Sequence, residues 1–272
     1  MGRDGPRPRR RVRGGRRLGG CRLGGCRNVI DVDGTLTERL RANPPGIHGA
    51  GDEYWGLAWP ALEWLESELR EGMSTLETGS GASTIVFAAA GTEHVAVTPD
   101  NDEETRIRAE CTSFGVSSDR VSFEIGFSHE VLPRVQQREL DVVLLDGAHG
   151  FPYPVLDWWY VAPQLRIGGC ILLDDAYMPP VAVVVDHARA SKAWDVECAV
   201  GYRTVVVRKL ADELPPFDWE GERIGGRMTF RYLPPAERAV ASARHRAFST
   251  RAGLAFVELY RRGSGLKWRK TG

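Results

Sequence analysis

Residues 76–84, "LETGSGAST", decide the fold of this chain, because they join an apolar strand to a helix through two glycines. Gly79 and Gly81 let the chain turn tightly and let a ligand approach the backbone. The first turn of the following helix offers free N–H groups to an anion. Several classes of nucleotide-binding fold share a Gly-x-Gly turn. The third glycine of Gly-x-Gly-x-x-Gly is absent here, which argues against a dinucleotide-binding fingerprint.

Strands and helices alternate along the chain around this turn. Apolar runs predict strands at 74–79, 94–98, 121–126, 140–147 and 168–175, and the segments 60–70, 82–91, 101–115, 128–137 and 151–165 predict helices. Nearly all-apolar strands separated by helices are typical of a parallel sheet covered on both faces. Two further runs, 194–201 and 204–210, have a two-residue gap that predicts an antiparallel hairpin. The predicted fold class is α/β: a Rossmann-like, doubly wound, mostly parallel sheet with an antiparallel C-terminal strand and helices on both faces.

The residues that follow each strand are the candidates for function, because ligands of open parallel sheets bind outside the carboxyl ends of the strands. The second strand ends at Thr98. Asp100 lies 21 residues after Gly79, close to the spacing at which a carboxylate usually holds a ribose diol.

Three carboxylates follow the fourth and fifth strands: Asp146, Asp174 and Asp175. Adjacent strand ends would bring them into one small volume, where like charges raise each other's pKa unless a cation neutralises them. A set of oxygen ligands suits Mg²⁺ or Ca²⁺ rather than Zn²⁺. The alternative is that each acid caps a helix or accepts a backbone N–H in a solvated cleft. His149, beside the cluster, is a candidate general base or carboxylate-orienting group, or else a structural loop residue.

These motifs together resemble those of the class I S-adenosylmethionine (SAM)-dependent methyltransferases, and most of all the small-molecule O-methyltransferase branch. The resemblance covers about residues 60–210 and rests on "LETGSGAST", "VSFEIGFSHEVLP", "VVLLDGAHG" and "GGCILLDD", in that order. It implies SAM as the cofactor and methyl transfer to a hydroxyl group of a small-molecule acceptor. The implied mechanism is an in-line transfer, in which the enzyme aligns the acceptor oxygen with the sulfonium methyl.

The resemblance also implies roles for individual residues. It places SAM against Glu77, Gly79, Gly81 and Ser83 at the methionine end, against Thr98 or Asp100 at the ribose, and against Ser128 and His129 at the adenine. It places Mg²⁺ among Asp146, Asp174 and Asp175, where the ion would bind and acidify the acceptor hydroxyl. The branch has an acid directly at the end of the second strand and a catalytic lysine near the end of the fourth, and this chain has neither. His149 is therefore expected to act as the catalytic base, next to Asp146.

A second motif, "DVDGT" at 31–35, has the Asp-x-Asp spacing of haloacid-dehalogenase-type phosphatases. Those enzymes need a buried strand before the motif, but only Val29 and Ile30 are apolar in the preceding "GGCRNVI". The favoured interpretation is a turn into a helix with Thr37 as its N-cap. A further alternative is a catalytically silent module that binds SAM, or nothing, and acts as a scaffold, because a fold alone does not determine function.

The chain divides into four predicted segments: an Arg/Gly-rich tail (1–27), a lead-in (28–59), the SAM-binding domain (60–210) and a basic extension with a helix at about 235–249 (211–272). The tail has almost nothing to bury and is expected to be disordered, either as an RNA-contacting tail or as a dispensable one. The extension could dock on the body, pair two subunits into a homodimer, or remain mobile, and the sequence leaves these three roles open.

The net charge is 0, but positively and negatively charged residues are concentrated in different parts of the chain. Residues 1–27 hold ten arginines against one aspartate, and residues 221–272 hold twelve lysines or arginines against three glutamates, so the body between them is acidic. An acidic body argues against direct nucleic-acid binding. The longest aliphatic run, 181–185, is far short of the ~20 apolar residues that cross a bilayer, and no secretory signal is expected. Five scattered cysteines favour free thiols in a reducing cytoplasm.

Overall fold

The computed structural model describes residues 34–48, 56–135, 139–212 and 233–248. The described residues from 34 to 212 belong to one compact unit, and helix α8 (Pro235–Phe248), at the place where a helix was predicted, belongs to a second. The Arg/Gly-rich tail at 1–27 lies outside the described residues, as does Asp31-Val32-Asp33 of the phosphatase-like motif. Disorder of the tail and a homodimer formed through the extension therefore stay predictions.

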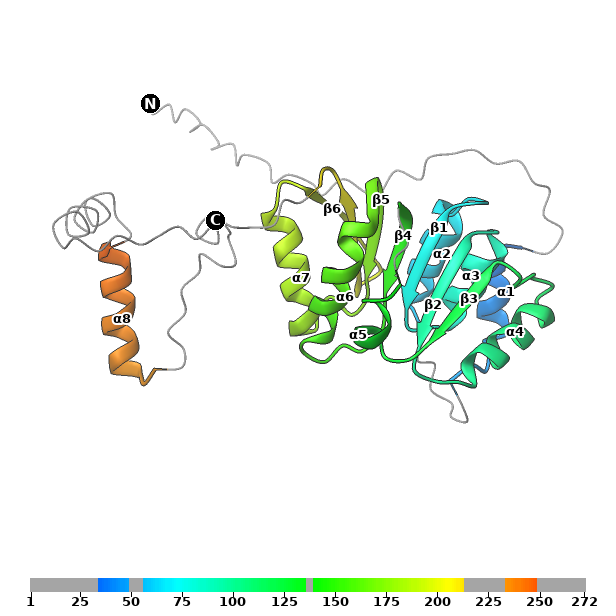
Figure 1. Ribbon diagram of the computed structural model, residues 1–272, viewed down its shortest axis with the longest axis horizontal. Coiled ribbons are helices and arrows are strands. Elements are labelled where there is room, and N and C mark those ends of the chain that lie inside the picture. Colours follow the sequence, from blue (N-terminus) through cyan, green and yellow to red (C-terminus); the bar gives the residue numbers. More distant parts are fainter. Residues whose placement is uncertain (1–33, 49–55, 136–138, 213–232, 249–272) are drawn as a thin grey trace, which may run out of the picture. The chain divides into compact units, whose positions relative to one another are not determined.

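A seven-stranded sheet forms the centre of the first unit (Figure 1). Its strands lie in the order β3 (Val121–Ile125), β2 (Glu93–Thr98), β1 (Ser74–Thr78), β4 (Leu140–Leu145), β5 (Leu165–Leu173), β7 (Thr204–Lys209) and β6 (Trp194–Val200). Neighbouring strands are parallel, except that β7 is antiparallel to both β5 and β6. The predicted mostly parallel sheet with an antiparallel C-terminal strand is confirmed, and that strand lies inside the sheet rather than at its edge.

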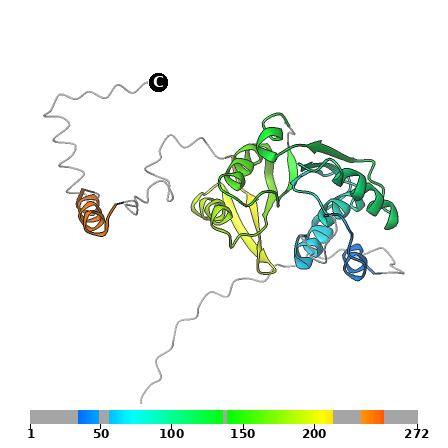
Figure 2. The same cartoon turned by 90° about the horizontal axis from the view of Figure 1, so that it is seen from below.

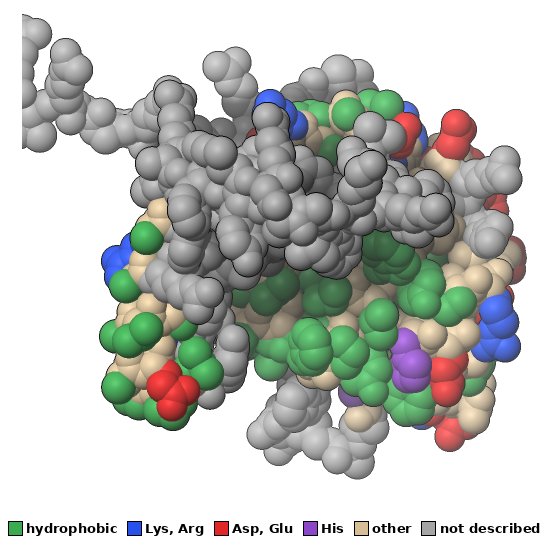
Figure 3. All heavy atoms as spheres, turned by 60° about the vertical axis from the view of Figure 1, so that its left-hand side comes forward, with side chains coloured by type: hydrophobic (Ala, Val, Ile, Leu, Met, Phe, Trp, Pro, Cys, Tyr) green, Lys and Arg blue, Asp and Glu red, His purple; other side chains and the backbone are tan. Residues whose placement is uncertain are grey.

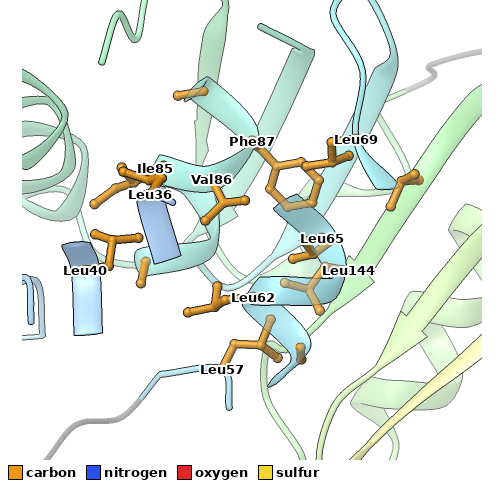
Figure 4. Close-up of a cluster of buried hydrophobic side chains, with 14 of the residues drawn as sticks. Leu36, Leu40, Leu57, Leu62, Leu65, Leu69, Ile85, Val86, Phe87 and Leu144 are labelled. Atoms are coloured by element: carbon orange, nitrogen blue, oxygen red, sulfur yellow. The ribbon is translucent and has the colours of Figure 1, made fainter. Parts of the chain in front are cut away.

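Helices cover both faces of the sheet because successive strand residues point to opposite sides. Leu172 of β5 packs with α1 (Leu36–Ala42), α2 (Trp59–Glu68), α3 (Ala82–Ala89) and α4 (Glu103–Ser113). Its neighbour Leu173 packs with α5 (Ser128–Val131), α6 (Tyr153–Val161) and α7 (Pro179–Ala190). The two layers of helices are visible in Figures 1 and 2. Figure 4 shows part of the first core, where side chains of α1, α2 and α3 gather with Leu144 of β4.

Two helices differ from their predicted extent. The helix expected over 128–137 ends at Val131, and residues 136–138 lie outside the described part of the chain. Helix α7, by contrast, contains the aliphatic run 181–185, for which no helix was predicted. Valine favours strands, so the run gives a weak helical signal. The proline pair at Pro179 and Pro180, placed where a helix can begin, is the signal that indicates it.

The start of α1 also differs from the prediction. Thr35, not Thr37, is the N-cap: its hydroxyl accepts a hydrogen bond from the Glu38 backbone N–H at 3.2 Å, and its own backbone N–H donates to Glu38 Oε2 at 2.8 Å. Thr37 is buried inside the helix. The glutamate three residues after Thr35 completes a capping box, and this spacing selects the earlier threonine.

No helix in the described ranges is long and apolar enough to cross a bilayer. On the face drawn in Figure 3, apolar side chains lie among acidic, basic and histidine side chains.

The central position of Leu144 makes it a test of this packing. The side chain is fully buried, so Leu144→Ala should lower the free energy of unfolding by about 2–5 kcal/mol. Leu210→Ala makes the same change at a side chain that is 52% exposed, and it should cost no more than about 0.5 kcal/mol. Urea denaturation measures both. Equal losses would contradict the burial of Leu144.

Candidate functional site

A cavity of about 670 Å³ opens at the carboxyl ends of the central strands. Its wall contains nine of the twelve predicted site residues: Gly79, Gly81, Ser83, Thr98, Ser128, His129, Asp146, His149 and Asp175. The other three, Glu77, Asp100 and Asp174, do not line it. The cavity also contains residues that were not predicted, above all His48, Glu103 and Arg203.

Gly79 allows the ends of β1 and β4 to meet. Its φ of +83° favours glycine, and a Cβ built there would lie 2.5 Å from the backbone oxygen of Asp146. No side chain fits at that distance. The absence of a side chain therefore brings the glycine loop next to the loop that carries Asp146 and His149.

Glu77 stabilises the glycine loop through hydrogen bonds to its buried carboxylate. Its carboxylate is fully buried and accepts hydrogen bonds from Ser83 Oγ (2.7 Å) and from the Thr84 hydroxyl, and His94 Nε2 lies 3.1 Å away. These contacts fasten the end of β1 to the first turn of α3. The predicted direct contact between Glu77 and the methionine end of a cofactor is not supported, because the carboxylate does not reach the cavity.

In the part of the cavity predicted to bind the ribose, the acidic side chain is Glu103 and not the expected Asp100. Asp100 points outward, where its Oδ2 pairs with Arg106 Nη2 at 2.5 Å. Thr98 is buried at the cavity wall and donates its hydroxyl to Glu103 Oε2 at 2.5 Å. Asp100 therefore does not fit as a cavity ligand, whereas Thr98 does.

Glu103 supplies the carboxylate that the end of the second strand lacks. It lies in the first turn of α4 and reaches back into the cavity, where Ser80 and Thr98 donate to Oε2 and His48 Nδ1 lies 3.1 Å from Oε1. Burial alone would raise its pKa, but the hydrogen bonds from His48, Ser80 and Thr98 outweigh burial and hold the pKa below its usual value. An acid in the first turn of the next helix is the sequence signal that could have identified it.

Aromatic rings surround the predicted adenine end. Ser128 and His129 begin α5, and the His129 ring lies 5.8 Å from the Phe127 ring and 5.2 Å from the Tyr153 ring, between centroids. All three rings line the cavity. The arrangement offers flat apolar surface with polar edges, which suits a planar heteroaromatic ring.

Asp157 is a buried acid near these aromatic rings. This residue of α6 is only 2% exposed, and burial raises its pKa to about 6, although the nearby polar and cationic groups oppose the rise. The neutral form is therefore favoured well above the pH at which an aspartate in water ionises.

The other end of the cavity is a cluster of acids around His149. Its Nε2 lies 3.5 Å from Asp146 Oδ1 and its Nδ1 lies 3.7 Å from Asp175 Oδ2. Burial raises the pKa of Asp146 to about 7, and the neighbouring Asp146 carboxylate raises the pKa of His149. The two carboxylates are near enough to stabilise the protonated form of His149, which suits a residue that accepts a proton.

The predicted Mg²⁺ site of Asp146, Asp174 and Asp175 does not fit the residues present. Asp174 is fully buried and already paired: Arg203 Nε lies 2.9 Å from Oδ2, and the Thr204 hydroxyl donates to Oδ1 at 2.6 Å. Burial would raise the pKa of Asp174, but the Arg203 contact outweighs it and lowers the pKa. Across the described ranges, no three His, Cys, Asp or Glu side chains are grouped so that they could hold a metal ion.

Comparison with known families agrees with this geometry. Residues 76–176 match a family model described as a methyltransferase domain, a stretch that runs from β1 to just beyond Asp175. The fold is Rossmann-like, with a cavity at the carboxyl ends of its central strands. The match to the family model confirms the resemblance to class I SAM-dependent methyltransferases that the motifs indicate. No curated protein matches the sequence.

Solved structures share the fold at low sequence identity. Cofactor-bound Rv0187 from MTB is 17% identical, with 58% of this chain and 83% of that chain covered and a TM-score of 0.51. The O-methyltransferase TomG from Streptomyces achromogenes, solved with SAM, is 18% identical over 65% and 86% of the two chains, with a TM-score of 0.47. A protein from Corynebacterium glutamicum is 16% identical over 65% and 90%, with a TM-score of 0.49.

The close approach at Gly79 generates a stability prediction. Gly72 also has a left-handed φ, +79°, but a Cβ there would meet no atom within 4 Å. Gly72→Ala should therefore lose only about 1–2 kcal/mol of unfolding free energy, from backbone strain. Gly79→Ala should lose about 1–3 kcal/mol more, because β1 and β4 must move apart. Urea denaturation of the two variants isolates the clash, and equal losses would show that no clash exists.

Asp157 generates a pH prediction. Its pKa is raised from 3.8 to about 6 in the folded state, so its contribution to stability is fully present below the unfolded pKa and is lost as the pH rises through 6. Asn cannot titrate. The stability of Asp157→Asn relative to the unmodified protein should therefore improve by about 2 kcal/mol between pH 4 and pH 7. Urea denaturation across this range measures the difference, and a constant difference would contradict the raised pKa.

Proposed function

We propose that this protein transfers the methyl group of SAM to a hydroxyl oxygen of a small-molecule acceptor. The observation that carries the proposal is one cavity lined by two chemically different sets of residues. The first set is the glycine loop, Glu103 and the rings of Phe127, His129 and Tyr153, and the second is the His149–Asp146 pair. The cavity volume, about 670 Å³, lies within the ~300–1,000 Å³ typical of small-molecule sites.

The residues of the first set fit SAM. A side chain at Gly81 would meet His48 Nε2 at 3.1 Å, so glycine keeps the loop open for a ligand. The ionised Glu103 carboxylate is an acceptor for the two ribose hydroxyls, and the ring of His129 offers a surface for the adenine. When bound, SAM would supply the electrophilic methyl group on its sulfonium.

His149 is the proposed base for the acceptor hydroxyl. Asp146 and Asp175 lie within 4 Å on either side of its ring, so the two carboxylates orient it and stabilise its protonated form. The protein's own contribution is to align the acceptor oxygen, to receive its proton on His149 and to exclude water from the buried floor.

The free thiols agree with the proposed cytoplasmic location. Cys111 and Cys170 are free and buried, and burial raises the pKa of their thiols to about 11 and about 12. Thiols with such pKa values remain protonated and unreactive at neutral pH.

Glu103 can be tested as the ribose-binding acid by titrating S-adenosylhomocysteine into the purified protein in a calorimeter. Glu103→Gln keeps the shape of the side chain but removes its charge, and it should weaken binding at least 10-fold, or about 1.4 kcal/mol. Asp100→Asn is the matched control, because Asp100 lies outside the cavity, and it should change the affinity less than twofold. The reverse result would restore Asp100 as the ribose acid.

His149→Ala tests the proposed chemistry. Removal of a general base should lower kcat by about 10²–10⁴-fold, whereas S-adenosylhomocysteine affinity should stay within a fewfold of the unmodified protein. The assay follows methyl transfer to a panel of hydroxylated acceptors. Binding without transfer to any acceptor would instead support a silent scaffold, and transfer confined to amines would contradict O-methylation.

A further inference from the structure

Arg203 lies in the acid cluster because β7 pairs with β5. That strand pairs antiparallel with β5, with Leu173 opposite Val205, so the residue just before β7 lies beside the residues that follow β5. The backbone N–H of Ala176 donates to the Arg203 carbonyl at 2.8 Å and fixes this alignment. Arg203 is thus held at the acids by the sheet itself.

The guanidinium contacts two of the three acids directly. Its Nε lies 2.9 Å from Asp174 Oδ2 and 3.1 Å from Asp175 Oδ1, and its Nη2 also contacts Asp174. The Arg203 side chain is 21% exposed and lines the cavity, whereas Asp174 is completely buried beneath it. The positive charge therefore lies between the buried acid and the space that an acceptor would occupy.

A divalent ion that binds Asp174 would have to displace the Arg203 guanidinium from it. Mg²⁺ binds carboxylate oxygens at about 2.1 Å, so it needs an oxygen of Asp174 that Arg203 does not hold. Separating a buried ion pair leaves an uncompensated charge and is strongly unfavourable. Asp174 is fully buried, Thr204 holds its other oxygen, and Arg203 already compensates its charge.

We propose that Arg203 is the resident cation of the Asp174–Asp175 cluster, that it excludes divalent metal ions, and that it supplies the positive charge at the acceptor end of the cavity. The role at the acceptor end rests on the proposed methyltransferase function. The exclusion of metal ions does not rest on that function, so experiments can contradict either claim without contradicting the other.

Manganese binding tests the exclusion without any acceptor. Mn²⁺ is titrated into the full chain and free Mn²⁺ is followed by electron paramagnetic resonance. The unmodified protein should show no binding that depends on Asp174, as judged against Asp174→Asn. Arg203→Met removes the charge at similar length and should bind Mn²⁺ at least 10-fold more tightly than the unmodified protein. The added Asp174→Asn substitution should abolish this gain.

Arg208→Met is the matched control. Arg208 also belongs to the β7 region but pairs with Glu197, outside the cluster, so its removal should leave Mn²⁺ binding unchanged. Mn²⁺ binding to the unmodified protein that disappears in Asp174→Asn would overturn the proposal. Both of these proteins keep Arg203, so the comparison does not depend on the folding of Arg203→Met. A folded Arg203→Met variant, verified by circular dichroism, that gains no Mn²⁺ binding would overturn it as well. Absence of methyl transfer would count against the proposed function and leave these results intact.

Discussion

The close contact between Gly79 and the backbone of Asp146 is the constraint on which the site depends. Parallel strands bring their carboxyl ends to one edge of a sheet, but the loops that follow meet only if one of them carries no side chain. With a glycine at this position, the loop that suits a cofactor and the loop that carries His149 border one cavity. Transfer of a group between two bound molecules requires such adjacency.

Buried acids hold this cavity in shape. Glu77 ties β1 to α3, and Asp174 ties the end of β5 to the start of β7. Neither lines the cavity, and each accepts hydrogen bonds from partners that lie elsewhere in the sequence. A buried carboxylate is stable only when its oxygens are paired, so these two act through the loops they position. The acids at the cavity surface, Glu103 and Asp146, are the ones available to ligands.

Charge balance differs between the two ends of the cavity. At the cofactor end, hydroxyls and His48 stabilise a single carboxylate, Glu103. At the acceptor end, Asp146 and Asp175 lie on either side of His149, and Arg203 pairs with Asp174 and Asp175. The insertion of β7 between β5 and β6 provides that arginine. One topological feature of the sheet thereby sets the electrostatics of the proposed reaction centre.

The sequence by itself determined the fold class, the strands, the glycine turn and most of the cavity wall. Apolar periodicity and turn glycines are local patterns that predict strands and the loops after them, and a parallel sheet brings those loops to one edge. It also identified Thr98 and His149 as residues that line the cavity. Only the tertiary structure decided that Glu103 rather than Asp100 lies at the cavity, that Glu77 is buried, and that Arg203 pairs with Asp174. The physical reason is that the direction and partner of a polar side chain depend on which distant element packs against it, and no local pattern records that.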